Sequence, residues 1–277
     1  MENRLKLIDK SNIQLRYQGY LNTPQLWKDD LIGGLQQFEF ESKTNSHFNK
    51  SSIDEIRLGK LIEHFVLHEL IENEFIDVVA SNIQVIDNKV TIGEIDALIK
   101  HLNEFIHLEI VYKFYLYDPL IKTSEIDKWI GPNRNDWLSK KIEKLKTKQF
   151  PILKHPKAKS ILNQLGLSSN IFQQKVLFKA QLFVPFNMLN NKFELINNQC
   201  IKGFYLSFKE VQKLKTTLFY MPSKLDWLLE PQLNVNWLTY SEFISVLETE
   251  LKQKRSPLCW VKNPQNELQK IFVVFWK

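Results

Sequence analysis

Cysteine is scarce in this chain, and so are the apolar runs and histidine motifs that mark several common protein classes. The two cysteines, Cys200 and Cys259, lie far apart, which excludes a disulfide framework and a zinc site built from thiolates. No apolar run reaches the roughly 18 residues of a membrane helix, and the first residues lack the apolar core of a secretion signal. His64 and His68 are four residues apart, but no HExxH motif or obvious third ligand accompanies them, so we interpret them as a polar helix face. These absences lead us to expect a soluble cytoplasmic protein without a membrane segment.

Positive charge is concentrated in one segment. The formal net charge of the 277 residues is +6, yet residues 137–160 alone hold eight lysines against one acidic residue, Glu143. The rest of the chain is therefore close to neutral. A lysine run of this kind is either a solvated helix face or a surface that binds the phosphates of a nucleic acid. The lysines whose spacing spans one helix face are Lys140, Lys141, Lys144 and Lys148.

Polar and apolar residues alternate along residues 91–116, TIGEIDALIKHLNEFIHLEIVYKFYL. This period of two predicts a pair of β-strands joined by a tight turn. In the first strand one face carries Glu94, Asp96 and Leu98. In the second strand one face carries His107, Glu109, Val111 and Lys113.

A turn at Leu102 and Asn103 would place Asp96 directly opposite Glu109. A shift of one residue would set the apolar face of one strand against the charges of the other, so this register is expected. Side chains that face each other across a strand pair have Cβ atoms roughly 5 Å apart, and two like charges there repel. Either solvent screens the pair at the edge of a sheet, or a divalent cation lies between the carboxylates.

Glu63 lies within the apolar stripe of a strong helix predicted over residues 53–75. A carboxylate in an apolar stripe is costly unless it is paired or binds a metal ion. Two interpretations are open at this point, a salt bridge with Arg57 or Lys60 and a metal ligand.

The pattern of periodicities predicts an α/β protein. Helices are expected over 53–75, 136–149 and 241–254, together with a short helix in the segment 13–27 that ends before Pro24. Strands are expected over 78–86, the hairpin, 175–184, 201–208, 235–240 and 271–276. No Gly/Pro/Ser-rich linker interrupts the chain, so we expect one domain in three parts. These parts are an N-terminal helical lead and loop (1–52), a core (53–186) and a C-terminal elaboration packed on that core (187–277).

Five segments of the first 150 residues resemble an uncharacterised bacterial family, domain of unknown function 1853. They are RLGKLIE (57–63), NIQV (82–85), GEIDALI (93–99), HLEIVYKFYL (107–116) and WIGPNRND (129–136). LRYQGYLNTPQLW (15–27) resembles the opening helix of the same family, and FKAQLFVP (178–185) is a weaker match. More loosely, the acidic residues and the order of elements resemble the PD-(D/E)XK nuclease superfamily. That resemblance implies a restriction-endonuclease-like αβββαβ core, a mixed sheet flanked by helices, with a C-terminal α/β extension.

The resemblance also implies roles for individual residues. Asp96 and Glu109 would bind Mg²⁺ or Mn²⁺, and Glu63 would complete the site directly or through water. Lys113 would orient the attacking water or stabilise charge on the phosphate. The superfamily lysine normally follows the acid by two residues, where this chain has Val111, so Lys113 lies two residues further along the strand.

The sequence thus leads to a hypothesis of a metal-dependent nuclease acting on DNA or RNA. The alternative is a protein that kept the nuclease fold, lost the chemistry, and binds nucleic acid or serves as a scaffold.

Overall fold

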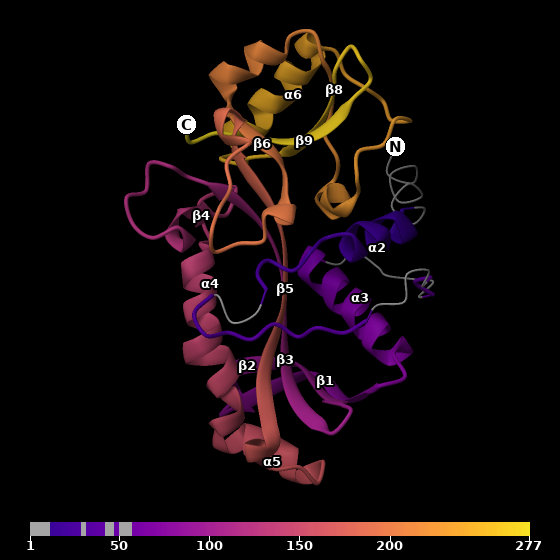
Figure 1. Cartoon of the computed structure of the whole chain (residues 1–277), viewed down its shortest axis with the longest axis vertical. Coiled ribbons are helices and arrows are strands. Elements are labelled where there is room, and N and C mark those ends of the chain that lie inside the picture. The colour runs from indigo at the N-terminus through magenta and orange to yellow at the C-terminus, as the bar shows by residue number, and fades with distance from the viewer. Residues whose placement is uncertain (1–11, 29–31, 42–46, 50–56) are drawn as a thin grey trace. The chain divides into compact units, whose positions relative to one another are not determined.

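The computed structural model of the chain describes residues 12–28, 32–41, 47–49 and 57–277 (Figure 1). Within this part of the chain, nine strands form a mixed sheet in the order β1-β2-β3-β5-β6-β9-β8-β7, with β4 paired to β3. The chain divides into two compact units. One comprises residues 25–112 and 140–179, and we call it the hairpin unit; the other comprises residues 1–24, 113–139 and 180–277, and we call it the C-terminal unit. The predicted mixed α/β class is confirmed.

The hairpin unit contains one long helix followed by a three-stranded antiparallel meander. Its elements are α3 (Leu58–Glu72), β1 (Ile76–Asp87), β2 (Val90–His101) and β3 (Glu104–Tyr117, whose end enters the C-terminal unit). After β3 come α4 (Leu138–Lys144), a π-helical turn (Leu145–Gln149), a 3₁₀ helix (Phe150–Lys154), α5 (Pro156–Gln164) and β5 (Phe172–Pro185). Helices α3 and α5 both pack against β1. The core beside α5 includes Val85, Ile95 and Leu162.

The predicted register of the central hairpin is confirmed. Strands β2 and β3 pair antiparallel with His101 opposite Glu104 and Ala97 opposite Leu108, around a two-residue turn at Leu102 and Asn103. Leu102 adopts φ of 54°, the left-handed conformation that tight hairpin turns require. The same register extended by one residue sets Asp96 opposite Glu109.

The C-terminal unit combines parallel and antiparallel pairs. Its elements are α2 (Ile13–Leu21), β4 (Trp129–Ile130), the end of β5, β6 (Ile201–Ser207), β7 (Leu218–Tyr220), α6 (Tyr240–Lys252), β8 (Leu258–Lys262) and β9 (Leu268–Val274). Strand β6 runs parallel to β5 and β9, while β8 runs antiparallel to β7 and β9. Helix α6 buries Phe243 and Leu247 in a core with Phe219 and Val261. Across the described residues, no helix is long and apolar enough to cross a bilayer.

The prediction of a strand over residues 235–240 was wrong. Only an isolated bridge joins Leu238 to Phe219 there, and the chain enters α6 at Tyr240. The segment does contain apolar and β-branched residues, which favour a strand. However, β7 has only three residues, and Leu238 makes both of its backbone hydrogen bonds with one of them, Phe219, so no longer pairing forms. Strands β7 and β8 and helix α5 were not predicted, because they are short segments whose pattern of polarity resembles that of a loop.

Replacing Gly203 with alanine should destabilise the protein strongly. Gly203 pairs with Lys270 between parallel strands, and a Cβ at this position would lie 1.9 Å from the Lys270 carbonyl oxygen. Because the obstacle is backbone, the strands must separate, and we expect a loss of about 3 kcal/mol in the free energy of unfolding. Gly59→Ala is the matched control, since a Cβ there has no neighbour within 4 Å. Denaturant titration should show the control unchanged or slightly stabilised; a Gly203→Ala protein as stable as the parent would contradict the pairing.

Candidate active site

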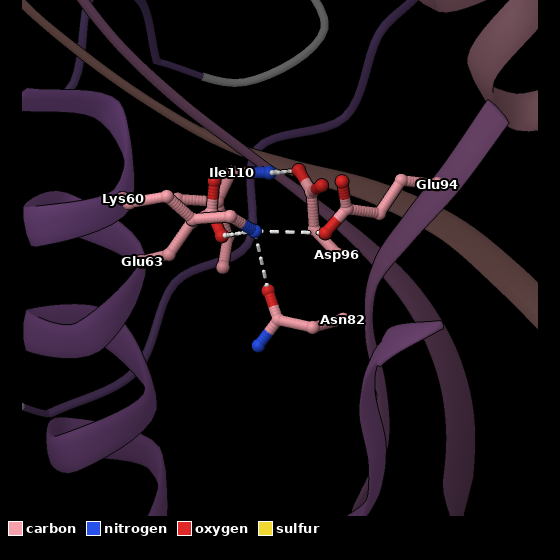
Figure 2. A network of polar contacts seen from close by, with 6 residues as sticks. All are labelled: Lys60, Glu63, Asn82, Glu94, Asp96 and Ile110. Atoms are coloured by element: carbon pink, nitrogen blue, oxygen red, sulfur yellow. Dashed lines mark hydrogen bonds and ion pairs between the residues drawn. The ribbon is translucent and has the colours of Figure 1, made fainter. Parts of the chain in front are cut away.

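Helix α3 presents Lys60 and Glu63 toward the first two strands of the meander (Figure 2). The helix buries its apolar residues, which include Leu61, Phe65 and Val66, and this fixes the rotation of the whole helix. Lys60 and Glu63 are three residues apart, so their side chains are neighbours on the helix surface.

The amine of Lys60 connects three oxygen acceptors from three elements. Its Nζ donates to Glu63 Oε2 at 2.5 Å, to Glu94 Oε1 on β2 at 2.8 Å and to Asn82 Oδ1 on β1 at 2.9 Å. The salt bridge between Glu63 and Lys60, one of the two interpretations left open by the sequence, is therefore present. Burial raises the pKa of Glu63, and the hydrogen bond from Lys60 opposes that rise. Burial lowers and the bonds to Glu63 and Glu94 raise the pKa of Lys60, with a net rise that keeps the amine charged.

The sheet is irregular at Asp96. Among the described residues, Asp96 has no backbone partner on β1, where Asn82 adopts φ of 53°. On the other side, the backbone pairing of β2 with β3 ends at Ala97. The Asp96 side chain replaces the missing backbone partner, because its Oδ2 accepts a hydrogen bond of 2.8 Å from the Ile110 amide (Figure 2). The register is the same on both sides of this gap, since Ser81 pairs with Ala97 and Ile83 pairs with Ile95.

Asp96 and Glu109 bring their carboxyl groups into hydrogen-bonding contact. Burial, followed by the charge of Glu109, raises the pKa of Asp96 to about 7. Burial also raises the pKa of Glu109 to about 7, although the charges of Lys141 and Lys144 and a hydrogen bond from Asp96 lower it. Two buried carboxyl groups in contact cannot both ionise cheaply, so they share a proton near neutral pH.

Glu109 is fully buried, and both of its oxygens have a protein donor. Oε1 accepts from His107 Nε2 at 3.1 Å, and Oε2 accepts from Gln149 Nε2 in a short hydrogen bond. Burial lowers the pKa of His107 to about 4, so the imidazole is neutral and its Nε2–H is the donor. Gln149 in turn accepts from Lys141 Nζ at 2.7 Å, which links the acidic pair to the lysine-rich helix.

Lys113 makes its ion pair with a different residue. Its Nζ lies 2.6 Å from Asp136 Oδ2, and both residues belong to the C-terminal unit. The two side chains are 36% and 35% exposed, so the pair is at the surface. Of the predicted site residues, Asp96 and Glu109 are in contact and the charge of Glu63 acts on Asp96, whereas Lys113 has Asp136 as its carboxylate partner.

A comparison with protein families extends over nearly the whole chain. Residues 11–274 match the family described as a domain of unknown function (DUF1853). The chain belongs to the DUF1853 family. Searches of curated proteins and of solved structures gave no match. Because the family description names no activity, the function of this DUF1853 chain has to be inferred from its site.

The carboxylates of Asp96 and Glu109 have the oxygen ligands that a hard divalent cation prefers, and such a cation can be bound by only two protein side chains. In the described part of the chain, no three His, Cys, Asp or Glu side chains gather closely enough to bind a metal by themselves. Mg²⁺, however, is commonly bound by one or two carboxylates, with water and substrate phosphate oxygens filling the other positions. Asp96 and Glu109 are in contact, and each carboxylate oxygen can accept more than one bond.

Sequence reasoning assigned no site role to three residues of this DUF1853 site, Glu94, Asn82 and Gln149, although it named Lys60 as a possible partner of Glu63. Glu94 carried a signal, because it shares a strand face with Asp96. Asn82 and Gln149 carried none. Gln149 reaches Glu109 because the helix after α4 widens into a π-helical turn at residues 145–149, a feature often found at functional sites.

The candidate nucleic-acid-binding lysines lie on and just after α4. Lys140, Lys144 and Lys148 are exposed, and Lys141 is half-buried against Gln149. The charge of Lys141 acts on both Asp96 and Glu109, and the charge of Lys144 acts on Glu109.

Proposed function

We propose that this protein is a metal-dependent phosphodiesterase that hydrolyses DNA or RNA, a nuclease of the PD-(D/E)XK type. The observation that carries the proposal is the Asp96–Glu109 carboxyl pair. The two groups are buried and in contact, and burial raises the pKa of each to about 7. A buried pair of this kind destabilises the metal-free protein at neutral pH, and functional sites are where such arrangements concentrate. The order of elements, α3, β1, β2, β3, α4 and β5, is also the αβββαβ order of that superfamily's core.

In the proposed site Asp96 and Glu109 would bind Mg²⁺ or Mn²⁺, with Glu63 completing the site directly or through water. The bound ion supplies Lewis-acid stabilisation of the phosphate and a more acidic water. The chain's own groups hold this arrangement in place. The Ile110 amide orients Asp96, and the neutral His107 with Gln149 orients Glu109.

The lysines of α4 would bind the nucleic-acid backbone beside the site. Phosphate contacts of this type position a substrate without reading its sequence. The proposal therefore includes nucleic acid as the partner and leaves DNA and RNA as equal candidates.

One observation favours the alternative, a catalytically inactive protein that binds nucleic acid or serves as a scaffold. Val111 occupies the usual position of the superfamily lysine, and Lys113 is paired with Asp136. If no other cation acts on the phosphate, the site would bind metal without cutting.

The test is a cleavage assay on labelled single- and double-stranded DNA and RNA, with Mg²⁺, Mn²⁺ or EDTA. We expect the parent to cut at least one substrate with either metal and none in EDTA. Glu109→Gln should lower the rate roughly 100-fold or more, since it removes one of the two negatively charged ligands that would hold the metal ion. Glu104→Gln is the matched control, because Glu104 is an exposed glutamate at the start of the same strand. Metal and nucleic-acid binding without any cleavage would favour the inactive alternative.

A further inference from the structure

Lys60 is a positive charge inside the acidic cluster. Its three acceptors come from α3, β1 and β2, and two of them are carboxylates (Figure 2). The Lys60 side chain is nonetheless 44% exposed, so a ligand can reach the amine. An exposed surface lysine usually gains little from one salt bridge, whereas this amine is held by three partners at once.

The partners of Lys60 are coupled to the carboxyl pair. The charge of Glu63 acts on Asp96, and the charge of Glu94 acts on both Glu63 and Glu109. Lys60 therefore bonds directly to Glu63, which would complete the metal site, and it is one carboxylate away from Asp96. The helix thus supplies a cation within this group of carboxylates.

Lys113 is less suited to that task. It follows Glu109 by four residues, roughly 13 Å along an extended strand, with the buried Val111 between them. Its amine also has a partner already, Asp136 at 2.6 Å.

We propose that Lys60, rather than Lys113, is the cation that contacts the scissile phosphate. This inference rests on the proposed function and names a further catalytic residue within it. In the reaction a water oxygen forms a bond to phosphorus while the bond from phosphorus to the leaving oxygen breaks, and its electron pair stays on that oxygen. The proton of the water passes to solvent, and the leaving oxygen takes a proton from solvent. Lys60 exchanges one carboxylate partner for a non-bridging phosphate oxygen, whose charge it stabilises as the new bond forms.

Four variants test the assignment: Lys60→Met, Lys60→Arg, Lys113→Met and, as an exposed-lysine control, Lys122→Met. Methionine keeps most of the apolar stem and removes the charge. Cleavage is measured with Mn²⁺ under single-turnover conditions, and Mn²⁺ affinity is measured by calorimetry in the absence of nucleic acid. We expect Lys60→Met to cut roughly 100- to 1000-fold more slowly, the range for losing one transition-state contact. Its Mn²⁺ affinity should be equal to or tighter than that of the parent, because a competing cation has gone.

Lys60→Arg should recover part of the rate, since it restores the charge, and Lys122→Met should cut like the parent. A Lys60→Met protein that cuts at the parent's rate per folded molecule, or that loses cleavage only together with Mn²⁺ affinity, would overturn the assignment. So would a loss confined to Lys113→Met. A parent protein that cuts nothing with metal would refute the proposed function itself, and the assignment of Lys60 would fail with it.

Discussion

Asp96→Asn should make the metal-free protein more stable at pH 8 and should abolish most of its cleavage. The parent folds with two carboxyl groups in contact, and the pKa of Asp96 is raised from 3.8 to about 7. A shift of that size corresponds to at most about 4 kcal/mol at high pH, at about 1.4 kcal/mol per unit. Asparagine removes the charge and can still accept from the Ile110 amide and donate to Glu109.

The direction of the pH dependence follows from the raised pKa values. Between pH 4 and 7 the folded protein keeps a proton on the pair that the unfolded chain has already lost. The stabilisation from these two groups is therefore complete below about pH 4 and is lost as the pH rises through about 7. The parent should lose stability across this window, and Asp96→Asn should lose much less. Metal binding should have the opposite pH dependence, because the proton on the carboxyl pair must leave before the cation binds. Mn²⁺ affinity should therefore rise with pH and level off above about 7.

Chemical denaturation at pH 4.5, 6 and 8, with and without Mn²⁺, measures both effects. Asp77→Asn, a change of the same chemistry at an exposed position of β1, serves as the control and should follow the parent. Mn²⁺ should stabilise the parent at pH 8 and leave Asp96→Asn nearly unaffected. Equal Mn²⁺ affinity in parent and variant would show that Asp96 is not a ligand, whatever the denaturation curves show.

The central hairpin was predictable because its determinants are local. Alternating polarity fixes which residues share a face, and a two-residue turn at Leu102 and Asn103 fixes the register. From those two facts alone Asp96 has to face Glu109. The helix that carries Glu63 was likewise predictable, since its buried face follows a helical period.

The polar network around the pair was not predictable, because it depends on contacts between distant segments. Asn82 accepts a hydrogen bond from Lys60 while its own backbone is in the left-handed conformation, which hydrophobic periodicity does not predict. Gln149 reaches Glu109 across forty positions in the chain through a π-helical turn. The sequence offered Lys60 as one of two partners for Glu63, but its bonds to Glu94 and Asn82 require the packed arrangement of α3, β1 and β2.

The triple variant Lys140→Gln, Lys144→Gln, Lys148→Gln should lose roughly 100-fold or more in nucleic-acid affinity at low salt. All three side chains are exposed on or just after α4. Lys141 is left in place because it bonds Gln149, and changing it would disturb Glu109 directly. If each lysine contacts one phosphate of duplex DNA, the slope of log affinity against log salt should fall by about 0.9 per residue, or about 3 in total.

Lys209→Gln, Lys213→Gln, Lys215→Gln is the matched control, since it removes the same charge from exposed lysines of the C-terminal unit. Net charge alone acts on both triple variants equally, whereas a binding surface at α4 predicts a loss in only one of them. Affinity is measured by fluorescence anisotropy over a salt series, with oligonucleotides of several unrelated sequences. Because phosphate contacts carry no base information, the loss should be the same for every sequence. Equal affinities and equal slopes for the two triple variants would mean that the α4 lysines form a solvated face, and the nucleic acid would have to bind elsewhere.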